Sequence, residues 1–355
     1  MTRLRAAAAV AAGLVLAAAG GGFGIPRLAK DRWGVTTVLG LLVLAVGLGL
    51  AAWGTVWLFR AAHGLWRVGV VLAVSAAAYV VVPTIGIAVA ATHAPRPHLG
   101  DATPTDVGLE YTDVEFPAAD GVRLSGWYVP SRNGDAVVLL HGAGSTRTAV
   151  IDHARVLAAL GYGVLLYDAR GHGRSGGRAM EFGWDGDADV AGAVRFVRRR
   201  PDAAAGRVSA VGMSMGGEEA LGALAATPDL CSVVAEGATG RTAADKAWLS
   251  DAYGVRGFAQ EGLDRLMYGV TDLLTPSGPP RSLRASVAAA APRRALLIAA
   301  RRVADEPKAA AYIAGGSGRS VEVWVVPGAG HTGALEARRA EWIQRVGDFL
   351  ARAEC

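Results

Sequence analysis

A serine between glycines is the residue of this sequence with the clearest potential for chemistry. Ser214 lies at the centre of Gly-Met-Ser-Met-Gly, residues 212–216. Residues 207–212 are typical of a buried strand and residues 215–226 of a helix. A strand that turns sharply into a helix needs glycine two positions to either side of the bend, so that the two elements do not clash. The hydroxyl would then be exposed as a nucleophile; the alternative is an idle serine in a glycine-rich turn.

A histidine near the end of the chain could activate this serine. His331 lies in "VVPGAGHTGAL", between the last expected strand and the closing helix. An imidazole there could accept the proton of Ser214 and return it to a leaving group. The other histidines lie in or beside the apolar N-terminal part, on a helix or in other loops. The alternative reading of His331 is a surface residue in a flexible turn.

A carboxylate should follow the strand "ALLIAA" and hold that imidazole in the correct tautomer. Asp305 and Glu306 follow it in "RRVADEP". We take Asp305 as the first candidate and Glu306 as the alternative. Either could instead be an acid exposed on the surface.

A glycine loop could supply part of an oxyanion hole. The strand at 136–140 runs into His141-Gly142-Ala143-Gly144, and such a loop can aim a backbone amide inward, opposite the amide of Met215. Losing one donor to a tetrahedral oxyanion costs about 3 kcal/mol. His141 could act as a base, but we favour a role in bracing the loop.

The surrounding pattern predicts the elements that must position these residues. Residues 109–116 and 122–129 alternate apolar and polar side chains, which indicates a hairpin. Strand and helix patterns then alternate to the end of the chain, which predicts a mostly parallel sheet with helices on both faces. Sites in such sheets gather at the carboxyl ends of the strands, where Ser214, His331 and the two acids fall.

The N-terminal part has a different character. Three uncharged apolar stretches cover residues 6–25, 33–59 and 68–92, and about 20 apolar residues cross a bilayer. We therefore expect a transmembrane module at 1–92, a polar linker at 93–106 and an α/β domain at 107–355 with a cap at about 237–291. The first stretch also fits a cleaved secretory signal, but we favour an uncleaved span.

Charge separates the two parts and leaves the orientation open. Residues 1–100 carry a net charge of +7 and residues 101–355 a net charge of −2, so the basic character does not indicate nucleic-acid binding. The signal-like start favours a multi-pass protein of the cell membrane with its domain outside the cytoplasm. The positive-inside rule does not decide, because the two sides would hold Arg3, Arg5, Arg60 and Arg67 against Arg27, Lys30, Arg32 and Arg96.

Together the motifs resemble those of the α/β-hydrolase superfamily over roughly residues 107–354. The motifs are "HGAG", "YDARGHGRSGG", "GMSMGG" and "VPGAGHTGAL". Ser214, then Asp305 or Glu306, then His331 follow the chain order nucleophile, acid, histidine. The branch is similar to membrane-anchored serine hydrolases of the dienelactone hydrolase and serine aminopeptidase type. The resemblance implies Ser214 as nucleophile, His331 as base, and the amides of Ala143 and Met215 as oxyanion donors. One departure is that residues 301–304 stand where a short glycine turn usually leads to the acid.

The expected activity is cleavage of a carboxylic ester, thioester or amide through an acyl-enzyme on Ser214, with a small-molecule or lipid acyl substrate. The alternatives are a catalytically silent hydrolase fold that serves as a membrane-bound binding module, and acyl transfer to an alcohol. Aromatic and methionine side chains of the cap could line an acyl pocket or join the cap to the core: Trp248, Tyr253, Phe258, Met267 and Tyr268.

Other chemistries lack a pattern in the sequence. Residues 171–176 match GxGxxG, but no apolar helix opens on the third glycine, and the resemblance implies a structural role for Asp168 and Arg170. No metal-binding or P-loop motif occurs, so we expect no cofactor and no metal. We expect Cys231, in a strand, and Cys355 not to form a disulfide with each other.

Overall fold

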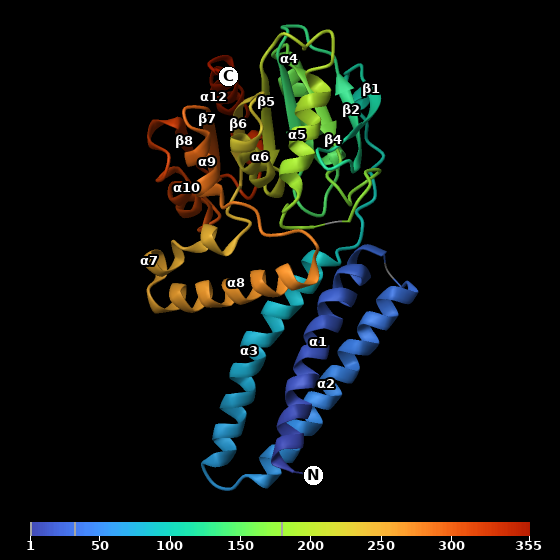
Figure 1. Ribbon diagram of the computed structural model, residues 1–355, viewed down its shortest axis with the longest axis vertical. Helices are drawn as coiled ribbons and strands as arrows, with labels where there is room; N and C mark the ends of the chain where they lie inside the picture. The colour runs from blue at the N-terminus through green and yellow to red at the C-terminus, as the bar shows by residue number, and fades with distance from the viewer. Residues whose placement is uncertain (1, 32, 179) are drawn as a thin grey trace. The chain divides into compact units, whose positions relative to one another are not determined.

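The computed structural model describes residues 2–31, 33–178 and 180–355, and the chain divides into two compact units (Figure 1). The first unit is Met1–Pro95 with Ala259–Pro276. The second is Arg96–Phe258 with Ser277–Cys355. Part of the stretch expected to form the cap therefore groups with the N-terminal helices.

Three helices in the described part of the first unit are long and apolar enough to cross a membrane. They are α1 (Arg3–Asp31), α2 (Val35–Ala61) and α3 (Trp66–Thr92), and each contains most of one expected apolar stretch. Helix α1 is longer than expected because it continues through Pro26. Arg32, one of the residues in the count of basic residues on each side, lies outside the described residues.

Glycine lets α1 and α2 pack backbone to backbone. A Cβ atom on Gly47 would lie 2.3 Å from the backbone nitrogen of Ala17, and one on Gly20 would lie 2.3 Å from that of Leu44. Such close approach between apolar helices depends on small residues, because van der Waals contact replaces the hydrophobic effect in lipid.

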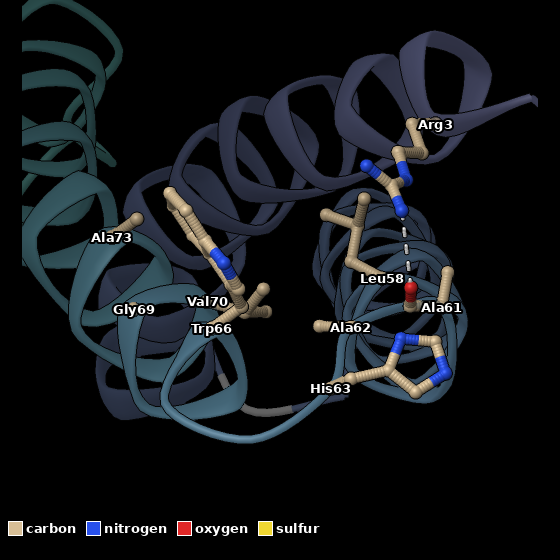
Figure 2. A pocket seen from close by; sticks show the side chains of 9 residues that line it. All are labelled: Arg3, Leu58, Ala61, Ala62, His63, Trp66, Gly69, Val70 and Ala73. Atoms are coloured by element: carbon tan, nitrogen blue, oxygen red, sulfur yellow. Dashed lines mark hydrogen bonds between the residues drawn. The ribbon is translucent and has the colours of Figure 1, made fainter.

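A cavity of about 490 Å³ lies at the end of this unit where α1 begins and α2 ends (Figure 2). Its lining is mostly apolar, with Leu58, Val70 and Trp66 among the lining residues. Arg3 donates a hydrogen bond to the carbonyl oxygen of Ala61 at 3.3 Å, which satisfies one of the free carbonyls at the end of α2.

In the second unit, the described residues form an eight-stranded sheet of order β1-β2-β4-β3-β5-β6-β7-β8. Strand β2 pairs antiparallel with β1 and β4, and the remaining neighbours are parallel. This confirms the predicted hairpin and mostly parallel sheet. The strands are β1 (Thr112–Pro117), β2 (Arg123–Val129), β3 (Ala136–Leu140), β4 (Gly163–Tyr167), β5 (Val208–Met213), β6 (Leu230–Glu236), β7 (Arg294–Ala300) and β8 (Val321–Val326).

Helices cover both faces of this sheet. Successive side chains of a buried strand point to opposite faces, so the apolar strands make both faces apolar. In β3, Val138 and Leu140 belong to the apolar cluster that includes residues of α5 (Gly186–Val197), α6 (Met215–Ala226), α9 (Leu283–Ala290) and α10 (Glu306–Ala314). Val137 and Leu139 belong to the cluster that includes residues of α4 (Ile151–Ala159), α11 (Ala334–Ala337) and α12 (Arg339–Ala351). Between β6 and β7 the chain also forms α7 (Leu249–Tyr253) and α8 (Val255–Leu274).

The expectation that the two cysteines stay apart is wrong. Cys231 in β6 and Cys355 form a disulfide, with Cα atoms 4.3 Å apart across 124 residues of sequence. The sequence reasoning placed Cys231 in a strand and Cys355 at the last residue, but it did not show where the fold brings the end of the chain. Helix α12 instead returns the chain to the beginning of β6.

The glycine packing of α1 and α2 predicts a sharp difference between neighbouring positions of one helix. Gly47→Ala should lower the melting temperature of the detergent-solubilised protein by several degrees, since the new methyl group must displace backbone atoms of α1. Gly49→Ala is the matched control, because a Cβ there has no atom within 4 Å. Equal melting temperatures, measured by circular dichroism, would mean that α1 does not pack on α2.

Candidate active site

The bend at Ser214 joins β5 to α6 in a strained backbone conformation. Ser214 has φ 52° and ψ −120°, a region that residues with a side chain rarely adopt. A Cβ on Gly212 would lie 2.3 Å from the carbonyl oxygen of Gly216, and one on Gly216 would lie 2.6 Å from that of His141. Both glycines are therefore required by close backbone contacts. Ser214 N donates to the carbonyl oxygen of Glu236 at 2.7 Å and holds the bend against β6.

Ser214, His331 and Glu306 form a continuous line of hydrogen bonds. The Ser214 Oγ atom lies 2.9 Å from His331 Nε2, and His331 Nδ1 lies 2.6 Å from Glu306 Oε1. With Nδ1 donating its proton to the carboxylate, Nε2 is left to accept the hydroxyl proton of Ser214. Glu306 is buried, while the His331 side chain is about half exposed. The three groups thus have the mutual geometry of a nucleophile, a base and the residue that orients the base.

Glu306 occupies the position for which Asp305 was the first candidate. Asp305 is exposed at the beginning of α10, and its Oδ1 accepts a hydrogen bond from the Tyr253 hydroxyl at 2.5 Å. Glu306 is the first residue of α10 and has one more methylene, so its side chain reaches back towards β7. Its second oxygen, Oε2, accepts from the Ala300 amide at 2.6 Å, which fixes the carboxylate in place.

A second carboxylate holds the loop that carries His331, and the sequence reasoning missed it. Glu236, at the carboxyl end of β6, accepts from the Ala334 amide at 2.7 Å and from the Trp342 indole at 3.3 Å. Thr332 in this loop has φ 53°. Among the described residues, Ser214 and Thr332 are the non-glycine residues with positive φ. An acidic residue at the end of an otherwise apolar strand was the signal in the sequence that could have identified Glu236.

Electrostatics favours the charged form of the imidazole. The hydrogen bond to Glu306 is the largest cause that raises the pKa of His331 above its ordinary value of 6.5, and desolvation opposes it. Burial raises the pKa of Glu236, which lies near Glu306 and His331. A positive charge formed on His331 during proton transfer would therefore be stabilised by the carboxylate beside it.

The glycine loop after β3 lies against the bend, and His141 braces it. A Cβ on Gly142 would lie 3.3 Å from Ser214 Cβ. His141 Nε2 accepts from the Ala169 amide at 3.0 Å, so its Nδ1 donates to the Gly142 carbonyl at 2.8 Å. Both ring nitrogens are thus used within the structure, and burial lowers the pKa of His141. Met215 is the first residue of α6, where amide groups lack partners within the helix.

The GxGxxG stretch is organised by the carboxylates of neighbouring elements. Asp168 accepts from the amides of Arg147 and Arg174, each at 3.0 Å. Arg170 is paired with Asp189 in a buried contact of 2.6 Å. Both residues therefore hold loops in place next to the glycine loop of His141.

Comparison with known proteins gives partial matches along the sequence. The model of the serine aminopeptidase family, S33, matches residues 131–272. An uncharacterised protein of Mycobacterium tuberculosis is 34% identical over 125 residues, which is 34% of this chain and 44% of that protein. The polyketide transferase GrgF of Penicillium sp. is 31% identical over 134 residues, which is 36% of this chain and 45% of that protein. The chain thus spans less than half the length of these curated relatives.

A likeness to solved structures extends over a larger share of the chain. An esterase of Pyrococcus furiosus, Pf2001, aligns with a TM-score of 0.57 and 28% sequence identity over 73% of this chain and 97% of the esterase. This chain combines the mostly parallel sheet with a serine at the bend after β5 and a histidine after β8. The chain belongs to the α/β-hydrolase superfamily.

Proposed function

We propose that the protein is a membrane-anchored serine hydrolase that cleaves a carboxylic ester, with thioesters and amides as related substrates. The observation that carries this proposal is the line of hydrogen bonds from Ser214 through His331 to Glu306. The likeness to an esterase of 28% identity supports the ester as substrate, because esters have leaving groups that need less assistance than amines.

The reaction would begin with attack of Ser214 Oγ on the carbonyl carbon as its proton passes to His331 Nε2. The carbonyl π electrons move to oxygen, and the amides of Met215 and Ala143, in the loop of Gly142, would stabilise that oxyanion. Collapse of this intermediate expels the alkoxide, which takes the proton from His331 and leaves an acyl group on Ser214. Water, deprotonated by the same imidazole, then releases the carboxylic acid and restores the serine.

Acyl transfer to an alcohol is a second candidate function. The match to a polyketide transferase, 31% identical over 134 residues, favours it. The first half of the reaction would be the same, and an alcohol would replace water in the second half. Product analysis with and without an added alcohol distinguishes the two functions.

We also propose that the hydrolase unit lies outside the cytoplasm, with α1, α2 and α3 spanning the cell membrane. Three spans place the two ends of the module on opposite sides. The disulfide between Cys231 and Cys355 supports the outer side for the hydrolase unit, because disulfides form and persist in oxidising compartments. The positive-inside rule alone left this choice open.

Ser214→Ala is expected to remove both labelling by a fluorophosphonate probe and hydrolysis of p-nitrophenyl esters. The reason is that the variant lacks the oxygen that forms the acyl-enzyme, while alanine replaces the side chain with little change in volume. Labelling is read by in-gel fluorescence and hydrolysis by absorbance over a series of acyl-chain lengths. A wild-type protein that folds and yet takes up no probe would contradict the proposed function and favour a catalytically silent fold.

Glu306→Gln is expected to lower kcat/KM about 10³- to 10⁴-fold, because a neutral amide no longer stabilises the imidazolium. Asp305→Asn is the matched control and should leave kcat/KM within about twofold, since its carboxylate bonds to Tyr253. The pH profile gives a second test. His331 must be neutral to act as a base, so the activity of the wild type falls as pH drops through its raised pKa. In Glu306→Gln that acid limb should move to lower pH; an unmoved limb would exclude Glu306 as the partner.

The location of the hydrolase unit can be tested through its cysteines. Cells are treated with N-ethylmaleimide under denaturing conditions, then the protein is reduced and modified with a maleimide-linked polymer. An oxidised Cys231–Cys355 pair should escape the first reagent and shift on a gel after reduction. Cys355→Ser should show no shift, because Cys231 is then blocked. A wild-type protein that behaves like this variant would place the unit in a reducing compartment.

A further inference from the structure

Helix α8 presents its apolar side to the outside. The exposed fractions of Val255, Phe258, Leu266 and Leu273 are 87%, 67%, 53% and 85%. A Cβ atom added to Gly262 or to Gly269 would meet no atom within 4 Å. These positions recur every three or four residues, so they form one continuous stripe along α8. We call the outer stripe the α8 face: Val255, Phe258, Gly262, Leu266, Gly269 and Leu273.

The opposite side of α8 is buried and contains polar groups. Glu261, Tyr268 and Thr271 are exposed by 6%, 7% and 0%. The Thr271 hydroxyl donates to the Met267 carbonyl within the helix at 2.9 Å. A surface helix of a water-soluble protein has the reverse arrangement, with its apolar stripe towards the core and its polar residues in solvent. The outward apolar stripe therefore indicates an apolar surrounding.

Basic side chains lie on both borders of the α8 face. Arg256 follows Val255 and Arg265 precedes Leu266, so the two arginines are displaced by about 100° to opposite sides. Both are exposed. Asp272 lies on the same border as Arg265, which makes the charge pattern mixed and leaves the apolar stripe as the dominant feature. Arginines in such positions can lay their methylene groups on hydrocarbon and keep the guanidinium among lipid headgroups.

We propose that α8 lies in the membrane–water interface, with the α8 face inserted into the bilayer that α1, α2 and α3 span. Residues 259–276 group with these three apolar helices in one compact unit. The segment that carries most of α8 therefore belongs to the same unit as the helices proposed to span the bilayer. Both glycines of the α8 face have open space beside them, and a protein partner could fill it only with side chains of matching shape. A fluid bilayer needs no such complementarity.

This contact would act on the hydrolase unit as well. The first turn of α8, Val255–Phe258, belongs to the second unit, so the chain connects an interfacial α8 directly to that unit. Resting on the proposed function, this points to esters with long acyl chains, which dissolve in the bilayer, as the substrate class of Ser214.

The test uses the full chain in phosphatidylcholine vesicles and an environment-sensitive label. Leu266→Cys and Leu273→Cys are each modified with a nitrobenzoxadiazole group, and fluorescence is recorded with and without lipids that carry a doxyl quencher near the headgroup. The described cysteines are both in the disulfide, so the introduced thiol takes the label. Gln260→Cys is the matched control, because it is exposed on the same helix away from the α8 face.

We expect doxyl lipid to quench the labels at 266 and 273 about threefold more than the label at 260. Equal quenching at the three positions would overturn the proposal. Blue-shifted emission at 266 and 273 without quenching by lipid would also overturn it, because a protein partner or a second copy then covers the face. The measurement does not depend on catalysis. A quenched α8 in a protein that takes up no fluorophosphonate would therefore leave the membrane contact standing and reject the hydrolase.

Discussion

The arrangement of the candidate site depends on one constraint, the positive φ of Ser214. A residue held in this conformation costs of order 1–3 kcal/mol and persists when its surroundings impose it. Here the surroundings are the Glu236 carbonyl, which accepts from Ser214 N, and the two glycines that let β5 and α6 approach. The hydroxyl is consequently presented at the end of the central strand, where loops from both neighbours can reach it.

Two carboxylates divide the task of holding the imidazole. Glu306 bonds directly to His331, whereas Glu236 accepts from Ala334 and so fixes the loop just after the histidine. Thr332, with its positive φ, lies between these two points of attachment. The site therefore contains two strained backbone positions, one at the nucleophile and one beside the base, and Glu236 of β6 accepts a hydrogen bond at or near each.

The parts of the fold that follow from local patterns could be predicted from the sequence. The Ser214 bend and the mostly parallel sheet depend on the residues next to each other in the chain, and both expectations are confirmed by the fold. The partner of His331 could not be chosen in this way, because Asp305 and Glu306 are adjacent and tertiary contacts decide which of them turns inward. The prediction that Cys231 and Cys355 stay apart was wrong for the same reason, because their disulfide joins segments that only the complete fold brings together.

The way in which Glu306 reaches its histidine affects how related proteins can be recognised. The carboxylate comes from the first turn of α10 and extends back to the Ala300 amide, so the acid reaches the histidine although residues 301–304 contain no glycine. A search pattern that demands aspartate after a short glycine turn would pass over this chain. Genomes screened with such a pattern would undercount hydrolases in which a glutamate side chain spans the remaining gap.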